Sequence, residues 1–248
     1  MNEDIFAMFK SSLWNDRMDW YRTLTSLYGR EFIRDFACPQ RFISKGTPHL
    51  HKQLLYFGAE RHKDCYASIY RFGGYSIRPS KGNECPDYTE PIIDRIAFDL
   101  DAHDNGVTIK ETFRDAMSFH KIFGKSCVII YTGNQGFHCY VMLKSLITKS
   151  NLSTIQKRIR SALNLNTACV STGQDTSRVL RVPYSIHTKT ECQVLPIHGG
   201  LDGITTEQIL QASGRVHEGV FINPMPIDYE TIEEDKLCSV LEEIKRKM

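Results

Sequence analysis

The sequence predicts a mixed α/β (α+β) protein, with an N-terminal α/β half followed by a β-α-β-β-α-β unit. Three observations favour this class. Short runs rich in β-branched and aromatic residues predict strands, as in residues 92–101. Apolar residues three and four positions apart predict amphipathic helices, as in residues 151–163. In the second half these strands and helices follow one another in the split βαβ order.

The N-terminal half is predicted from spacing and composition. Residues 1 to about 35 are expected to be helical, because aromatic and aliphatic residues recur there at helical spacing. Residues 54–77 are rich in β-formers and predict strand structure. A loop at residues 79–91 then separates this half from the next. We therefore expect three parts, an N-terminal half at residues 1–88, an RRM-like half at 89–200 and a C-terminal helical tail at 201–248.

The second half predicts a regular succession of elements. They are a strand at residues 92–101, a helix between Thr108 and Gly124, strands at 127–131 and 137–143, a helix at 151–163 and the strand VLRV at 179–182. Thr108 and Glu111 predict a capping box at the start of the first helix, and Gly124 predicts its end. Together the six elements have the topology of an RRM-like fold. Short strands near residues 192–197 and a helix near 229–247 complete the chain.

Composition excludes several classes of protein. The 248 residues are 41% hydrophobic and 24% charged, which is an ordinary globular composition. Eight cysteines contain no CxxC pair, so we expect reduced core thiols and a cytoplasmic location. The acidic N-terminus lacks a long apolar run, and no stretch approaches the length of a membrane span. We therefore expect neither a signal peptide nor a membrane partner.

Positive charge gathers in one region, although the net charge is only +2. The cations of this region are Lys149, Lys157, Arg158, Arg160, Arg178, Arg181 and Lys189. Such local asymmetry indicates a surface that meets phosphates. For Lys157, Arg158 and Arg160, a solvated helix face is the alternative explanation.

Two carboxylates close the strand RIAFDLD at residues 95–101. Strand alternation places Asp99 and Asp101 on one face and the large apolar residues on the other. Neighbouring carboxylates repel each other, and a bound cation keeps both of them ionised. Their oxygen donors favour Mg²⁺ or Mn²⁺. A solvated strand end is the alternative explanation for an isolated DxD pair.

A glycine-framed turn carries the next candidate residue. His138 follows the turn at residues 132–136, and alternation places it opposite the apolar face of its strand. Gly133 and Gly136 permit close backbone approach and can expose N–H groups to an anion. A lone histidine on a strand is more often structural, but here the glycines and the nearby DxD pair favour a functional role.

These motifs resemble those of the archaeo-eukaryotic primase (AEP) superfamily. TGNQGFH at residues 132–138 resembles its SGxxGxH element, and IAFDLD at residues 96–101 resembles its first metal motif. RVLRVPYSIHTKT at residues 178–190 resembles its third region, RxxRxPxSxHxKT. The superfamily includes primase small subunits, primase-polymerases (PrimPol) of plasmids and viruses, and polymerase domains of bacterial end-joining ligases. The resemblance covers roughly residues 65–197 and implies an AEP-like catalytic core.

The resemblance also implies a role for individual residues. Asp99, Asp101 and Asp175 would bind two Mg²⁺ or Mn²⁺ ions for nucleotidyl transfer to a 3′-hydroxyl. The residues expected at the incoming triphosphate are Thr132, Gly136, His138, Arg178, Arg181, His187 and Lys189. Arg178 is the weaker candidate among the cations, because strand alternation places it opposite Arg181 unless a bulge intervenes.

The sequence departs from the family pattern at two places. Relatives often carry a basic residue where Gln135 stands, so one phosphate contact is lost or moved. In many relatives the third acid lies further upstream, near Thr167, where this chain has no carboxylate. Asp175 is the only acid between Asp115 and Glu191 and is chosen by elimination. A turn aspartate is its alternative explanation.

A structural zinc ion is expected to be absent, although relatives often carry one. His62, Cys65 and Cys85 could supply three ligands, with a fourth from His49, His51 or Cys38, but their spacing is not diagnostic.

The predicted function is DNA primase or primase-polymerase activity that uses NTPs or dNTPs. Expected partners are a DNA template and primer, with a helicase domain or a regulatory primase subunit as further candidates, in a protein of the nucleoid or of a plasmid or virus. A Mg²⁺-dependent phosphatase of the haloacid dehalogenase type is one alternative, because DxD and an apolar strand ending in Thr132 fit its first two motifs. A non-catalytic RRM-like nucleic-acid-binding module is the other.

Overall fold

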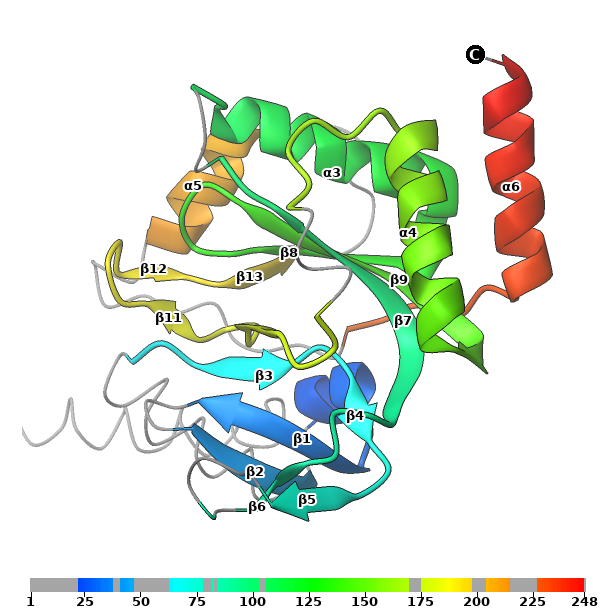
Figure 1. Cartoon of the computed structure of the whole chain (residues 1–248). Coiled ribbons are helices and arrows are strands. Elements are labelled where there is room, and N and C mark those ends of the chain that lie inside the picture. Colours follow the sequence, from blue (N-terminus) through cyan, green and yellow to red (C-terminus); the bar gives the residue numbers. More distant parts are fainter. Residues whose placement is uncertain are drawn as a thin grey trace, which may run out of the picture.

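The computed structural model has a mixed α+β architecture built on one large antiparallel sheet (Figure 1). It describes residues 22–37, 41–46, 63–77, 82, 84–102, 106–169, 175–197, 204–214 and 227–247. Within these residues the sheet has nine strands in the order β10-β3-β1-β4-β7-β9-β8-β13, and β2 pairs with β1. The predicted α+β class is confirmed.

The sheet combines strands from both predicted halves of the chain. Its strands are β1 (Glu31–Ala37), β2 (Arg41–Gly46), β3 (Tyr66–Ser68), β4 (Arg71–Phe72), β7 (Pro91–Leu100), β8 (Cys127–Tyr131), β9 (Phe137–Ile147), β10 (Val179–Arg181) and β13 (Leu195–Ile197). Two small ribbons lie outside it, one of β5 (Tyr75–Ile77) with β6 (Glu84–Pro86) and one of β11 (Ile186–His187) with β12 (Cys192–Gln193). The boundary predicted near residue 88 stays a prediction.

Two helices cover one face of the central strands β7, β9 and β8. They are α3 (Ile109–Phe123), which continues into the short 3-10 turn η2 (Gly124–Ser126), and α4 (Lys149–Ala162). The predicted capping box of Thr108 and Glu111 is present, and Gly124 ends α3. Phe98 of β7 packs against Phe119 of α3, with ring centroids 4.9 Å apart. The apolar face of β7 therefore meets the helices, as alternation predicted.

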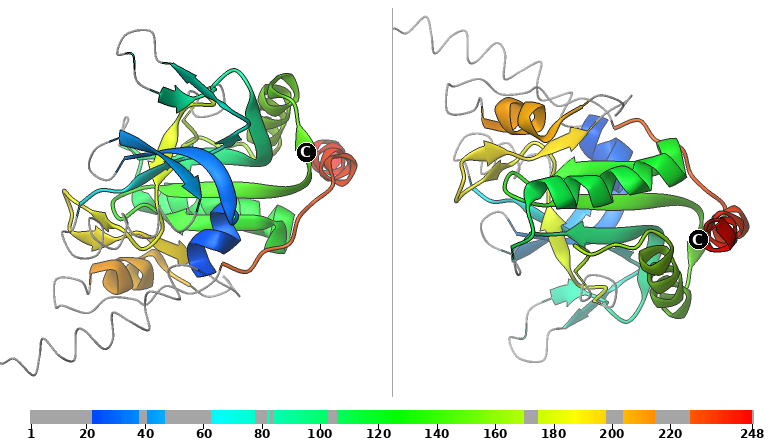
Figure 2. Two further views of the ribbon diagram at one scale, coloured as in Figure 1. Left: turned by 90° about the horizontal axis from the view of Figure 1, so that it is seen from below. Right: turned by 90° about the horizontal axis from the view of Figure 1, so that it is seen from above.

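The remaining helices lie at the margins of the sheet. The helix α6 (Glu234–Lys247) packs beside α4 (Figure 2). Arg158 of α4 pairs with Glu242 of α6. The helix α5 (Thr206–Gly214), which lies within the expected helical tail, packs near β12. Within the described residues, no helix combines the length and hydrophobicity needed to cross a bilayer.

The N-terminal prediction is partly wrong. Residues 1–21 lie outside the described residues, and residues 22–28 are helical as predicted. The helix does not continue to residue 35, because β1 begins at Glu31. This strand pairs with both β2 and β3, and hydrogen bonding to two neighbours outweighs the local helical spacing. Within residues 63–77, the predicted strand structure is confirmed as β3, β4 and β5.

The sixth element of the RRM-like unit is also corrected. VLRV forms β10, which lies at the edge of the sheet and pairs with β3 of the N-terminal half, not with β7. A segment that precedes VLRV in the sequence lies beside the C-terminal end of β7, where an antiparallel bridge joins Leu100 to Ala168. Asp101 N donates to Thr167 O at 3.0 Å on one side of this bridge, and Cys169 N donates to Asp99 O at 2.8 Å on the other. Residues 167–169, and not VLRV, therefore lie beside the end of β7.

One cysteine departs from the expectation of reduced thiols. Cys65 is fully buried and is disulfide-bonded. It therefore has no thiolate to offer a zinc ion. Six other described cysteines carry thiols, including Cys85. The remaining zinc candidates Cys38, His49, His51 and His62 lie outside the described residues.

Candidate active site

The end of β7 brings Asp99 into a buried polar cluster. Asp99 lies on the sheet face opposite the helices and is 9% exposed. Its register partner on β9 is His138, and His138 Nε2 lies 3.7 Å from Asp99 Oδ1. Asp101 follows the last residue of β7 and is partly exposed. The first two predicted motifs thus meet across two adjacent strands.

Arg178 also lies in this cluster, although strand alternation made it the weaker candidate among the cations. Its Nη2 donates to Asp99 Oδ2 at 3.3 Å. Arg178 precedes β10, so strand alternation relative to Arg181 does not apply to it. The carboxylate of Asp99 consequently lies between an imidazole and a guanidinium.

His138 is neutral at physiological pH. Burial lowers the pKa of its imidazole to about 4; the Asp99 charge opposes this shift, whereas Arg181 and Arg178 add to it. The ring is 3% exposed, and among the described residues its Nδ1 has no hydrogen-bond partner. The other ring nitrogen, Nε2, is the one that faces Asp99, so the imidazole has one nitrogen at the carboxylate and one without a partner among the described residues.

This lowered pKa makes the stability of the fold depend on pH. The unfolded chain takes up a proton on His138 near pH 6.5, whereas the folded chain resists until about pH 4. The His138 contribution is therefore fully present above pH 6.5 and is lost as the pH falls through this window. At pH 5 we expect a loss of about 2 kcal/mol relative to pH 8. Urea unfolding at pH 8 and pH 5 measures this loss in the free energy of unfolding, which should be smaller for His138→Gln than for the parent protein. An equal loss in both proteins would show that His138 is not the group responsible.

The two glycines of the hairpin make close packing contacts. Gly133 has a φ of 84°, and a Cβ there would lie 2.8 Å from His187 Cβ. A Cβ on Gly136 would lie 2.6 Å from Leu100 O and 3.6 Å from Asp101 Cα. The hairpin is therefore packed directly against both the end of β7 and the third motif.

Thr132 closes the hairpin turn. Its Oγ1 donates to Gly136 O at 3.1 Å, its backbone N donates to the same oxygen at 3.0 Å, and the residue is 6% exposed. The hydroxyl hydrogen is thus used inside the turn. Gln135 is exposed at the tip, and its carbonyl accepts a hydrogen bond from Thr112 Oγ1 at 3.0 Å.

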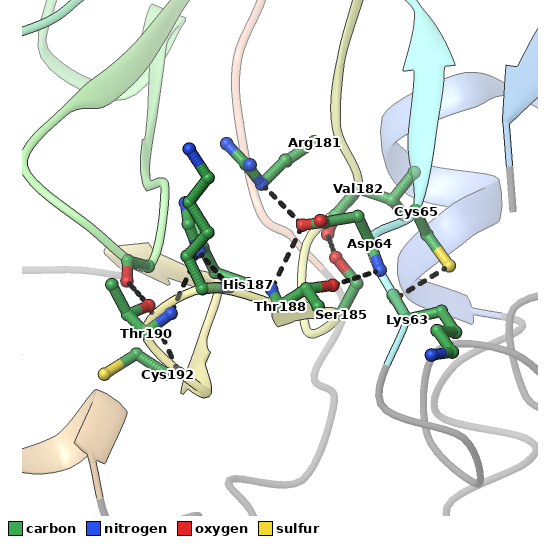
Figure 3. A network of polar contacts seen from close by, with 12 residues as sticks. Lys63, Asp64, Cys65, Arg181, Val182, Ser185, His187, Thr188, Thr190 and Cys192 are labelled. Atoms are coloured by element: carbon green, nitrogen blue, oxygen red, sulfur yellow. Dashed lines mark hydrogen bonds and ion pairs between the residues drawn. The ribbon is translucent and has the colours of Figure 1, made fainter. Parts of the chain in front are cut away.

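A carboxylate that sequence reasoning missed fixes Arg181 (Figure 3). Arg181 Nε donates to Asp64 Oδ1 at 3.1 Å, and Thr188 N donates to the same oxygen at 3.3 Å. Burial raises the pKa of Asp64, but hydrogen bonds from Thr188 and the Arg181 charge outweigh it and hold this pKa below its usual value. The guanidinium of Arg181 also lies over the ring of Tyr66, 5.0 Å from its centroid.

His187 has a defined tautomer. Its Nδ1 accepts hydrogen bonds from the backbone N of Lys189 at 3.2 Å and of Thr190 at 3.4 Å. Burial and the charge of Arg181 lower the pKa of His187, so the neutral ring carries its hydrogen on Nε2. Lys189 itself is exposed. His187 can therefore donate one hydrogen bond to an anion.

Asp115 is a second missed carboxylate. It lies on α3, is 5% exposed, and its Oδ2 accepts from Asn166 N at 3.1 Å, Thr167 N at 3.1 Å and Thr167 Oγ1 at 2.9 Å. Thr167 in turn pairs with Asp101 through its carbonyl. Asp115 therefore anchors the segment that borders the proposed metal carboxylates.

Removing this anchor should destabilise the protein. Asp115→Ala leaves three donors without their acceptor, two of them buried on Thr167, which costs about 1–3 kcal/mol. Urea unfolding measures this loss, and amide hydrogen exchange should accelerate at Thr167 and Asp101. Lys121→Ala, an exposed change on the same helix, is the control and should alter neither. Unchanged exchange at both amides would contradict the anchoring role.

The structure does not bring Asp175 together with the other proposed metal ligands. Its side chain is exposed, and its Oδ1 accepts from Ser177 N at 2.9 Å and Ser177 Oγ at 2.6 Å. This is the hydrogen bonding of a turn aspartate. Throughout the part of the chain that is described, no group of three His, Cys, Asp or Glu side chains is arranged to hold a metal ion. The DxD pair has the oxygen donors that Mg²⁺ or Mn²⁺ requires, while a third protein ligand is not in place.

Comparisons with known proteins bear on the fold. No protein-family model matches the chain, and no curated protein matches it. The polymerase domain of Mycobacterium tuberculosis Ligase D, solved in complex with DNA, is similar with a TM-score of 0.50 and 14% identity over 96% of this chain and 88% of that one. The AEP domain of the cyanophage S-2L primase-polymerase is similar with a TM-score of 0.48 and 14% identity over 79% of this chain and 96% of that one.

The chain therefore shares the fold of the Ligase D polymerase domain, and it carries the motifs identified in its sequence on β7, β9 and residues 178–190.

Proposed function

We propose that this chain is a primase or primase-polymerase, which transfers nucleotides from NTPs or dNTPs to a 3′-hydroxyl under the direction of a DNA template. The observation that carries the proposal is the environment of Asp99. This carboxylate is buried between neutral His138 and Arg178, at the end of a strand whose next side chain on that face is Asp101. Together with the fold, this arrangement supports a nucleotidyl-transfer site.

The proposed roles follow from the donors present. Asp99 and Asp101 would hold Mg²⁺ or Mn²⁺, with Asp175 as the proposed third carboxylate. Such an ion supplies charge stabilisation at the reacting oxygens. His138 and His187 are neutral rings suited to donate hydrogen bonds to phosphate oxygens.

Cations and the hairpin would complete the triphosphate site. Arg178, Arg181 and Lys189 would neutralise phosphate charge, and Gly136 and Thr132 would shape the hairpin beside it. A DNA template and primer are the proposed macromolecular partners, since the similar Ligase D polymerase domain was solved with DNA. A helicase domain or regulatory subunit stays a further proposal.

Neither alternative function explains the site as well. In the phosphatase alternative the hydroxyl of Thr132 would bind phosphate, yet its hydrogen is donated to Gly136 O inside a buried turn. In the RRM-like binding module the open sheet face would offer aromatic rings to bases. Here Asp99 and His138 lie opposite one another on that face.

A primer-synthesis and primer-extension assay tests the proposal. The protein is supplied with single-stranded or primed DNA, Mg²⁺ or Mn²⁺, and either ribonucleotides or deoxyribonucleotides. Metal-dependent incorporation from at least one pool supports the proposal. Metal-independent binding of nucleic acid without synthesis would support the binding module, and phosphate release from small phosphoesters would support the phosphatase.

A further inference from the structure

Asp64 is a carboxylate to which the proposed nucleotide site assigns no role. It lies two residues before β3, which pairs with β10. Its hydrogen bonds connect the start of β3 to two residues of the third motif, Arg181 and Thr188 (Figure 3). Besides accepting from Arg181 and Thr188, it donates from its own backbone N to Thr188 Oγ1 at 3.1 Å. Two hydrogen bonds thus join Asp64 to Thr188, which lies between His187 and Lys189.

Arg181 is held from two sides. Asp64 binds its Nε, and Tyr66, its register partner on β3, lies under its guanidinium plane. The hydrogen bond to Asp64 uses only Nε of Arg181, and the Arg181 side chain is 20% exposed. The two Nη groups are therefore on the part of the guanidinium that Asp64 does not engage.

The charge of Arg181 reaches both histidines of the site. It lowers the pKa of His138 on β9 and the pKa of His187 on β11. Geometry agrees, because Asp64 Oδ1 accepts from both Arg181 and Thr188, the neighbour of His187, and a Cβ on Gly133 of the hairpin would lie 2.8 Å from His187 Cβ. A triphosphate bound between the hairpin motif and the third motif would come within reach of the Nη groups of Arg181.

We propose that Asp64 is a positioning residue, which holds Arg181 by Nε so that its two Nη groups meet the triphosphate of a bound nucleotide. The inference rests on the proposed function. Asp64 has two opposite effects on a phosphate, since it orders Arg181 and also repels negative charge. The pair is partly exposed, at 20% and 28%, so solvent screens the repulsion. Ordering a long side chain in advance is worth about fivefold in affinity, and this effect dominates.

The test measures binding of dATP, and of inorganic tripolyphosphate, by calorimetry without DNA. Asp64→Ala removes the hold on Arg181 and should weaken both ligands about fivefold. Asp64→Asn keeps an oxygen acceptor without the charge and should bind within about twofold of the parent protein. In an Arg181→Gln background, Asp64→Ala should weaken binding no further, because the residue it positions is gone.

Three results would overturn the inference. They are unchanged or tighter binding by Asp64→Ala, additive effects of Asp64→Ala and Arg181→Gln, and an equal loss in Asp87→Ala, which removes a partly exposed carboxylate from the turn before β7. If Asp64→Ala does not fold, Asp64→Ser is a second truncation with the same expected loss.

A separate readout distinguishes failure of the inference from failure of the proposed function. If the parent protein binds neither ligand, the proposed nucleotide site is wrong. The Arg181 Nε–H resonance in an NMR spectrum then decides the positioning role by itself. It should be protected from exchange in the parent protein and in Asp64→Asn, and unprotected in Asp64→Ala. Equal protection in all three proteins would overturn the inference.

Discussion

Asp99→Ala is expected to reduce nucleotide incorporation by about a thousandfold or more. Asp99 is one of three proposed metal carboxylates, and it also contacts His138 and Arg178. Removing a single preorganised electrostatic group from an active site typically costs about 10²–10³ in kcat, and losing a metal ligand removes the contribution of the ion as well. Primer extension with Mg²⁺ and with Mn²⁺ measures the loss.

The variant also has a measurable effect that does not depend on activity. Asp99 opposes the lowering of the His138 pKa, whereas Arg178 and Arg181 add to it. Without Asp99, the imidazole should be still harder to protonate, so its NMR titration should move to lower pH. A shift to higher pH would contradict the electrostatic description of the cluster.

Matched controls separate catalysis from folding and from DNA binding. Asp87→Ala removes a partly exposed carboxylate outside the site and should leave incorporation unchanged. Asp99→Ala should keep the far-ultraviolet circular dichroism and the DNA affinity of the parent protein. Incorporation within tenfold of the parent protein by a folded Asp99→Ala would show that the DxD pair does not hold the catalytic metal.

Local patterns were enough to predict the centre of the site. Alternation in RIAFDLD and FHCYVML places each side chain on a known face, and Asp99 and His138 are register partners in the structure. The capping box of α3 was equally predictable, because its two residues are only three positions apart. Periodicity thus gave the faces of the elements correctly wherever neighbours along the chain determine them.

Pairings between distant segments were not predictable in this way. VLRV has the composition of a strand, but its sequence does not indicate that it pairs with β3 and not with β7. Asp64 and Arg181 are separated by 117 positions, and Asp115 and Thr167 by 52. Each acid is unremarkable in the sequence, and its role depends on a fold that one sequence does not specify by spacing. For the same reason, the position of Arg178 beside Asp99 could not be derived from alternation.

Gly136→Ala is expected to destabilise the protein by about 1–3 kcal/mol, the usual cost of adding a methyl group to a tightly packed site. The added Cβ would lie 2.6 Å from Leu100 O, a separation that real Cβ atoms essentially never show. This carbonyl belongs to the backbone of β7, which pairs with Phe137 on β9 and is bridged to Ala168 on its other side. Because both sides are held, relief requires the hairpin or the strand end to move.

Urea unfolding of Gly136→Ala measures the loss of stability. Gln135→Ala is the control, because its exposed side chain lies in the same turn without this contact. The control should unfold at the same urea concentration as the parent protein. An unchanged unfolding midpoint for Gly136→Ala would show that the contact between the hairpin and β7 relaxes without cost.

The same variant distinguishes two explanations for the glycine of this motif. If Gly136 serves to expose its N–H to phosphate, Gly136→Ala should weaken nucleotide binding and leave the metal site intact. The structure favours a steric reason, since the Cβ would crowd Leu100 O and the Cα of Asp101. Displacing Asp101 should then lower Mn²⁺ affinity, measured by electron paramagnetic resonance without nucleotide, in protein that still binds dATP. The glycine would be required because the turn that carries His138 packs against the backbone that carries the metal carboxylates.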